Sequence, residues 1–462
     1  MSAELQERVA YELALAFEAA GVRHAFIHGL ERFPAFTSRD LDLLVPSDQI
    51  ENAVAAAERH FRSSGHRFVS HRRINGSCWC FVAASAGRTV CEFDLVPRLR
   101  WGPAILADEP RALSRIGPFR VDPWAGFVKR VLVQLLGGNI AKLSRRHEEL
   151  ALSDSERLHV PAVLSAYVGV TLAEMTMSAI DERDLNRLRN LIPRLRRSVV
   201  ARCVTRRPRR LLAATVDWAR NELAASPIAR PIVPLLAVVG VDGVGKSTLV
   251  EHVRVQLRER LPVLDVQTRH WRPSLIPPLK QVVRGRFTAD PSPAQPPRRS
   301  PGRGQLLRLA YYGVDFCIGG WWRDRRASAG LVAVVYDRCL LDMLVDPVRF
   351  GLTSTAGVRC IRRIAPAPDV VVLLHDDPDE IHARKGELDV REIARQQAEW
   401  LALAAAGEVH VVLSAREPVD VLAARVVDHV IDRFLGQSNP RGSASLVHAM
   451  DGVRGPTTGR GE

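Results

Sequence analysis

The sequence predicts an α/β protein that carries a doubly wound parallel sheet in its C-terminal half. The first observation is that short apolar runs, typical of buried strands, alternate there with segments of helical periodicity. The second is that a glycine-rich turn joins one of these runs to a helical segment. In the N-terminal half several strand-like runs follow one another with few helices, which predicts an α+β domain. The predicted strands of the C-terminal half are residues 232–239, 263–268, 331–336, 369–374 and 409–413.

The glycine-rich turn reads VVGVDGVGKST at residues 238–248 and satisfies the phosphate-cradle pattern G-x-x-x-x-G-K-S. Glycines let successive backbone N–H groups turn inward without side-chain clashes, so these donors and a helix N-terminus converge on an anion. We expect Lys246 to reach the β- and γ-phosphates of ATP and Ser247 to ligate Mg²⁺. A turn that merely contains glycines is the alternative, but the match of fixed positions and flanking elements favours the cradle. The expected cofactor-binding residues are Gly240, Val241, Asp242, Gly243, Val244, Gly245, Lys246, Ser247 and Thr248.

Length, charge and cysteine content limit the functional classes. A chain of 462 residues is expected to form two or three domains. The net charge of +14 comes mainly from arginine spread along the chain, and no aromatic and basic recognition motif accompanies it, so nucleic acid is not an expected partner. The seven cysteines lack metal-ligand spacing and fit a reducing compartment. Neither a signal peptide nor an apolar run of membrane-spanning length is visible, so we expect a cytoplasmic protein without a membrane partner.

Carboxylates recur on strand-like runs of the N-terminal half. Asp40 and Asp42 alternate along the run 40–45, and Asp94 lies on the later run 89–96. Alternate side chains of a strand share one face, and two carboxylates on one face suit Mg²⁺ ligation. The alternative is that these aspartates merely terminate half-buried strands.

The order of helix, strand, glycine, Asp-x-Asp strand, helix and a strand with a third carboxylate resembles the nucleotidyltransferase fold of the DNA polymerase β superfamily over residues 1–120. The resemblance implies that Asp40, Asp42 and Asp94 form a metal-binding triad. Members that transfer nucleotides carry a small residue after the glycine, and here Leu30 stands at that position. This departure argues against retained nucleotidyl transfer.

Composition divides the rest of the chain. Residues 121–230 are helical and rich in arginine, and we expect them to form a helical basic tail and connector after the N-terminal domain. Residues 231–436 are expected to form the C-terminal domain, in which the middle of the proline- and arginine-rich stretch 273–303 is expected to be a mobile loop. Residues 437–462 are rich in glycine, serine and proline and are expected to be disordered.

Further motifs follow the phosphate cradle in order. The run 331–339 ends in the residues DRC, residues 368–378 read PDVVVLLHDDP, and residues 384–385 are RK. Together with the cradle, these motifs make residues 235–435 resemble thymidylate kinase and its relatives, although a cysteine replaces the usual aromatic residue or histidine after the Asp-Arg pair.

The resemblance implies ATP-dependent phosphoryl transfer to a nucleoside monophosphate, thymidylate by default, with Mg²⁺ as cofactor. It implies that Asp242 contacts the sugar hydroxyl of the acceptor, and that Arg338 clamps the acceptor's phosphate through its planar fork. Relatives commonly form dimers, so a homodimer is an open expectation. The implied catalytic residues are Lys246, Asp337, Arg338, Arg384 and Arg391, with Asp337 and Ser247 serving the metal. Arg384 and Arg391 lie on a segment that resembles a lid, for which a solvated helix face is the alternative.

Two departures concern the acceptor. Family members carry Arg-Glu-Pro-Gly after the second strand, whereas residues 269–273 read RHWRP. They also carry Ala-Asp-Arg in the base-reading helix, where residues 314–316 read VDF. A different small phosphorylated acceptor is therefore an alternative, with Asp342, Asp346 and Arg349 either lining an altered acceptor site or facing solvent. A nucleotide-binding sensor or scaffold with a degenerate nucleotidyltransferase domain is the remaining alternative.

Overall fold

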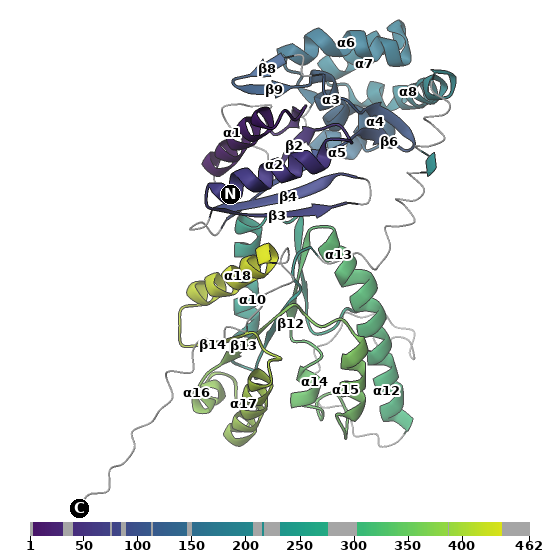
Figure 1. The fold of residues 1–462 in the computed structure, drawn as a ribbon. Helices are drawn as coiled ribbons and strands as arrows, with labels where there is room; N and C mark the ends of the chain where they lie inside the picture. The colour runs from purple at the N-terminus through teal and green to yellow at the C-terminus, as the bar shows by residue number, and fades with distance from the viewer. Residues whose placement is uncertain are drawn as a thin grey trace, which may run out of the picture. The chain divides into compact units, whose positions relative to one another are not determined.

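The chain forms two compact units, Met1–Ser226 and Pro227–Glu462, and Figure 1 draws their elements, many of them labelled. The computed structural model describes residues 3–30, 40–73, 76–84, 89–111, 114–145, 150–206, 215–216, 232–275, 303–386 and 388–436. Most of the expected mobile loop, at 276–302, lies outside the described residues, and so does the expected disordered tail at 437–462. Within the described ranges, the helices fall short of the length and apolar character that crossing a bilayer requires.

A seven-stranded mixed sheet is the framework of the N-terminal unit. The strands of this unit are β1 (Ala25–His28), β2 (Asp40–Leu44), β3 (His66–Arg72), β4 (Cys78–Ala84), β5 (Val90–Val96), β6 (Leu99–Trp101), β7 (Ala104–Ala107), β8 (Ser114–Ile116) and β9 (Phe119–Val121). The strand order is β3-β4-β5-β2-β1-β9-β8, while β6 and β7 pair separately. β2 and β5 run parallel, as do β1 and β9, and the other neighbours are antiparallel.

One face of the sheet packs in a hydrophobic core with α1 (Ala3–Ala19) and α2 (Ile50–Ser63). On β2, Leu41 and Leu43 belong to the hydrophobic core, which also contains Phe17 of α1 and Phe61 of α2. Alternate side chains point to opposite faces, so Asp42 lies on the face away from this core. The same strand therefore supplies both core packing and a carboxylate.

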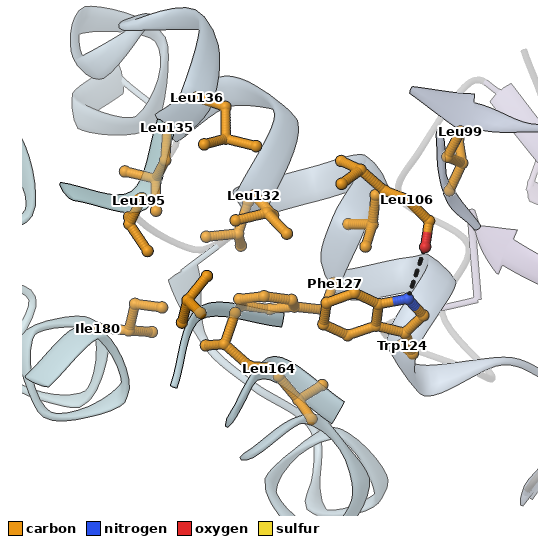
Figure 2. Packing of buried hydrophobic residues seen from close by; sticks show 14 of the residues in the cluster. Leu99, Leu106, Trp124, Phe127, Leu132, Leu135, Leu136, Leu164, Ile180 and Leu195 are labelled. Atoms are coloured by element: carbon orange, nitrogen blue, oxygen red, sulfur yellow. Dashed lines mark hydrogen bonds between the residues drawn. The ribbon is translucent and has the colours of Figure 1, made fainter. Parts of the chain in front are cut away.

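A second hydrophobic cluster lies among the helices that follow β9. Asp122 caps α3 (Pro123–Phe127) by accepting a hydrogen bond from the Ala125 N–H group. Trp124 is buried, and its Nε1 donates to the Leu106 carbonyl oxygen at 3.1 Å (Figure 2). The helical segment thereby packs into the same unit as the strands. The later helices are the π-helix η1 (Val128–Leu132), α4 (Val133–Gly137), α5 (Ile140–Arg145), α6 (Asp154–Val168), α7 (Val170–Asp181) and α8 (Leu185–Arg206).

Parallel strands form the sheet of the C-terminal unit, which confirms the predicted parallel sheet. They are β10 (Leu236–Val239), β11 (Asp265–Arg269), β12 (Val332–Asp337), β13 (Val370–His375) and β14 (Val411–Ser414). The order is β11-β12-β10-β13-β14, with β10 in the centre. All side chains of β10 are buried, as a central strand of a parallel sheet requires.

The parallel arrangement brings the ends of several strands to one edge of the sheet. The turn after β10, Asp337 at the end of β12 and Asp376 after β13 all lie at this edge. The helices of the unit are α10 (Lys246–Arg260), α12 (Arg303–Val314), the π-helix η3 (Asp315–Asp324), α13 (Arg325–Ala329), α14 (Asp342–Val345), α15 (Ala356–Ile364), α16 (Pro378–Lys385), α17 (Val390–Ala405) and α18 (Val419–Gly436).

Candidate functional site

The turn after β10 adopts a backbone that requires glycine. Gly240, Gly243 and Gly245 have φ angles of +142°, +90° and +104°, a region that other residues rarely adopt. A Cβ atom at Gly240 would lie 2.3 Å from the Leu374 carbonyl oxygen on the neighbouring strand β13. The turn leads into α10, whose first backbone N–H groups have no partners within the helix and can bind an anion.

Lys246, the first residue of α10, is a buried cation. Its side chain is only 5% exposed, and its Nζ lies 3.5 Å from Asp242 Oδ1. The same ammonium donates to the Val241 carbonyl oxygen at 2.8 Å. Burial lowers the pKa of Lys246 to about 8, although the nearby charges of Asp342 and Asp337 oppose this shift. A poorly hydrated cation inside the turn interacts strongly with an anion that enters it.

Ser247 and Asp337 meet where α10 begins and β12 ends. The Ser247 hydroxyl donates to Asp337 Oδ2 at 2.7 Å. Asp337 Oδ1 is buried and accepts no hydrogen bond from any residue that the structure describes. A hydroxyl and a carboxylate with an unused oxygen form the kind of oxygen-donor set that Mg²⁺ prefers, so these residues fit the ion. Because Mg²⁺ usually keeps several waters and phosphate oxygens as ligands, two protein groups suffice.

Asp242 is the centre of an ionic cluster beside Lys246. Its carboxylate forms ion pairs with both Arg338 and Arg349. Arg338 has a φ of +83°, and its backbone N–H donates to the Val238 carbonyl oxygen at 2.9 Å, which turns the chain sharply after β12. Arg338 Nη1 also lies 3.6 Å from Asp342 Oδ1. The cluster therefore joins the turn, the end of β12 and the segment after α14.

Arg338 retains an unused donor inside this cluster. Its side chain is 12% exposed, and Arg338 Nε is buried without a hydrogen-bond partner among the described residues. A buried guanidinium N–H without an acceptor is costly unless a ligand supplies one.

The predicted lid arginines occupy different environments. Arg384, at the end of α16, donates to Asp376 Oδ2 at 2.5 Å, and Arg416 Nε lies 3.1 Å from Asp376 Oδ1. On α17, Arg391 is exposed and forms no hydrogen bond or ion pair with the described residues. Arg395, on the same helix, donates to the Val345 carbonyl oxygen at 3.1 Å. Sequence reasoning does not single out Asp376, because one more aspartate after an apolar strand carries no distinguishing spacing.

The residues at the predicted base-reading positions hold a loop together. Arg272 Nη1 lies 3.0 Å from Asp315 Oδ2, and both side chains are almost completely buried. Asp315 also accepts hydrogen bonds from the backbone N–H groups of Ser274, at 3.1 Å, and Leu275, at 2.7 Å. Both carboxylate oxygens of Asp315 are therefore committed to this loop. The neighbouring Trp271 packs in an apolar cluster rather than at an open surface.

The N-terminal carboxylates lie side by side on β2 and β5. In the parallel register, Asp42 pairs with Asp94 and Asp40 pairs with Glu92, so these positions share the face opposite the core. Asp42 and Asp94 are buried, while the side chain of Asp40 lies outside the described structure. The described residues contain no group of three or more His, Cys, Asp or Glu side chains arranged for a metal ion. The metal triad stays a prediction.

Two neighbours of these carboxylates bear on the site. Lys129 Nζ, in η1, lies 3.1 Å from Asp42 Oδ1. The sequence carries no signal for this contact, because the two residues are 87 positions apart. Leu30, which stands where a small residue is expected, is buried in the hydrophobic core with α1 and α2.

The C-terminal unit thus combines a parallel α/β sheet with a glycine turn, a buried lysine and a serine–aspartate pair at one sheet edge. No protein-family model matches the sequence, and no curated protein matches it either. Among solved structures, the chain is similar to thymidylate kinase from Ehrlichia chaffeensis, with a TM-score of 0.31 and 14% identity, over 43% of this chain and 98% of that one. Residue roles therefore have to come from the geometry of the site.

Proposed function

We propose that the C-terminal unit transfers the γ-phosphoryl group of ATP to a phosphorylated acceptor, with a nucleoside monophosphate as the acceptor class and thymidylate as its default member. The observation that carries the proposal is the meeting of three groups beside the glycine turn. The Ser247 hydroxyl lies 2.7 Å from Asp337 Oδ2, and buried Lys246 precedes Ser247 on the same helix. Phosphoryl transfer depends mainly on positioning and charge neutralisation, which these groups supply.

Each residue has a role in this proposal. The backbone N–H groups of the turn and the Lys246 ammonium bind the β- and γ-phosphates of ATP. Ser247 and Asp337 hold Mg²⁺, which when bound neutralises charge on the phosphate oxygens. Arg338 binds the phosphate of the acceptor through its planar fork.

The lid segment completes the proposed site. Arg384 and Arg391 supply positive charge that moves over the phosphates as the segment closes and excludes water. Arg384 must leave Asp376 to do so, whereas exposed Arg391 has no such contact to break among the described residues.

The described contacts do not assign residues to the base of the acceptor. Arg272 and Asp315 are paired with each other and with a loop, so neither is free to read a thymine ring. The alternative is therefore a small phosphorylated acceptor other than thymidylate. A nucleotide-binding sensor would use the same turn, and it differs in binding ATP without acceptor-dependent turnover.

The test is a screen of the full-length protein with ATP, Mg²⁺ and a panel of nucleoside monophosphates, in which ADP formation and phosphorylated product are both measured. We expect acceptor-dependent turnover that Lys246→Ala lowers by roughly 100-fold or more, because the lysine neutralises transition-state charge. Val255→Ala, an exposed position on the same helix, is the control and should keep the wild-type rate. Tight ATP binding with no transfer to any acceptor would support the sensor instead.

A second candidate function belongs to the N-terminal unit. Asp42 and Asp94 are register partners on adjacent parallel strands, and two adjacent carboxylates suit a divalent cation that assists nucleotidyl transfer. Asp40 is the third proposed ligand. Burial of Leu30 where a small residue is expected weighs against this activity.

A further inference from the structure

The ionic cluster around Asp242 contains more positive charge than the Asp-Arg motif predicts. Lys246, Arg338 and Arg349 all approach the Asp242 carboxylate. The side chains of Arg338 and Arg349 are 12% and 19% exposed, so both guanidiniums are largely withdrawn from water. Cations that converge in such a setting favour a ligand that is itself an anion.

One N–H group of the cluster also has no hydrogen-bond acceptor among the described residues. Arg338 Nε is buried without an acceptor among the described residues, although the terminal nitrogens of the same guanidinium contact Asp242 and Asp342. The Asp242 carboxylate contacts both arginines but accepts no hydrogen bond from Arg338 Nε. A phosphate has more acceptor oxygens than a carboxylate and can meet several N–H groups at once.

The turn that carries Arg349 is fixed by its own hydrogen bond and follows a residue that contacts α17. Its backbone N–H donates to Asp346 Oδ1 at 3.1 Å, which closes the turn after α14. The turn begins at Val345, whose carbonyl oxygen accepts the hydrogen bond from Arg395 of α17. The chain just before Arg349 is therefore hydrogen-bonded to α17, the helix that also carries the predicted lid residue Arg391.

We infer that Arg349 is a second clamp for the acceptor's phosphate beside Arg338, and that the Asp242 carboxylate occupies both guanidiniums until that phosphate replaces it. The inference rests on the proposed function and assigns two arginines to the phosphate monoester of the acceptor. An acceptor that offers only a hydroxyl cannot release the arginines from Asp242, because it brings no charge to exchange for the carboxylate.

The first experiment compares wild type, Arg349→Gln and Arg349→Lys in the transfer assay with the best acceptor of the panel. We expect Arg349→Gln to raise the acceptor KM roughly 10- to 100-fold and to leave the KM for ATP within about twofold, because charged hydrogen bonds to the acceptor alone are lost. Arg349→Lys should recover only part of the loss, since an ammonium lacks the bidentate fork. Arg359→Gln, an exposed arginine on α15, is the matched control.

The second experiment measures binding of a phosphate monoester alone and requires no turnover. Binding of methyl phosphate, which has no sugar or base, is followed by phosphorus NMR in wild type, Arg349→Gln and Asp242→Asn. We expect Arg349→Gln to weaken binding and Asp242→Asn to strengthen it, each by roughly 10-fold, because the second change removes the competing carboxylate. Thermal melting of each variant verifies the fold.

The outcomes separate the two claims. Transfer by the wild type with an unchanged acceptor KM in folded Arg349→Gln overturns the inference and leaves the proposed kinase activity standing. Methyl phosphate binding that responds to both substitutions, without transfer to any acceptor, supports the clamp and overturns the kinase proposal. Binding that neither substitution changes, or that is absent in wild type, overturns the clamp.

Discussion

The buried position of Lys246 makes the site sensitive to pH. Burial lowers the pKa of Lys246 to about 8, from an ordinary value of 10.5. Only the protonated side chain attracts phosphates, so we expect kcat/KM for ATP to fall as the pH rises through about 8. Bound ATP raises the pKa again, so kcat should decline at a higher pH than kcat/KM. A pH profile of both constants checks this.

The control for the pH profile is Lys246→Arg. Its guanidinium stays protonated across this range, so whatever ATP binding remains should lack the decline near pH 8. A decline that persists would assign the titration to another group. Protein stability should change with pH in the opposite direction to kcat/KM. The unfolded state binds the lysine proton more tightly than the folded state, so this residue's contribution to the free energy of unfolding should increase from about pH 8 to 10.5.

At the scale of elements, the β10–turn–α10 unit depends on the close approach of Gly240 to β13. We expect Gly240→Ala to lower the free energy of unfolding by about 1–3 kcal/mol, because its Cβ would lie 2.3 Å from the Leu374 carbonyl oxygen. Denaturant unfolding measures the change. Gly436→Ala is the matched control, since its Cβ would meet no atom within 4 Å. Equal destabilisation by both substitutions would contradict the close approach.

A second element-scale prediction concerns the loop that Asp315 holds to η3. Asp315→Asn removes the negative charge that pairs with the buried Arg272 guanidinium, and we expect a loss of about 3–5 kcal/mol in the free energy of unfolding. Replacing both residues, as in Arg272→Met/Asp315→Asn, should cost less than the sum of the single changes. Additive losses would show that the two side chains are not coupled.

At the scale of the whole molecule, the two units offer separate candidate sites. We expect Asp42→Asn/Asp94→Asn to leave acceptor-dependent phosphoryl transfer unchanged, whereas Lys246→Ala should lower it by roughly 100-fold or more. Nucleotidyl transfer by the N-terminal unit is measured as release of pyrophosphate from nucleoside triphosphates. This activity should be lost in Asp42→Asn/Asp94→Asn and unchanged in Lys246→Ala. Loss of phosphoryl transfer in the folded double variant would show that the N-terminal carboxylates contribute to that reaction.

Much of the fold is readable from local sequence. The run 331–336 predicts a strand that the structure has at Val332–Asp337, and the run 369–374 predicts one found at Val370–His375. Such runs are readable because burial of a parallel strand on both faces demands continuous apolar residues. The π-helical stretch Asp315–Asp324 is not readable, because its apolar spacing differs little from that of an α-helix.

The sequence by itself determined the glycine turn, the lysine and serine that follow it, and the positions along the chain of the strands around them. These features depend on fixed local spacing and on backbone angles that only glycine adopts easily. Only the tertiary structure decided which arginines meet Asp242, since Arg349 lies 107 positions away. It also decided that Asp315 binds its own loop and that Asp42 lies beside Asp94. Contacts between distant residues depend on how strands and helices pack, and short-range patterns in the chain do not encode that packing residue by residue.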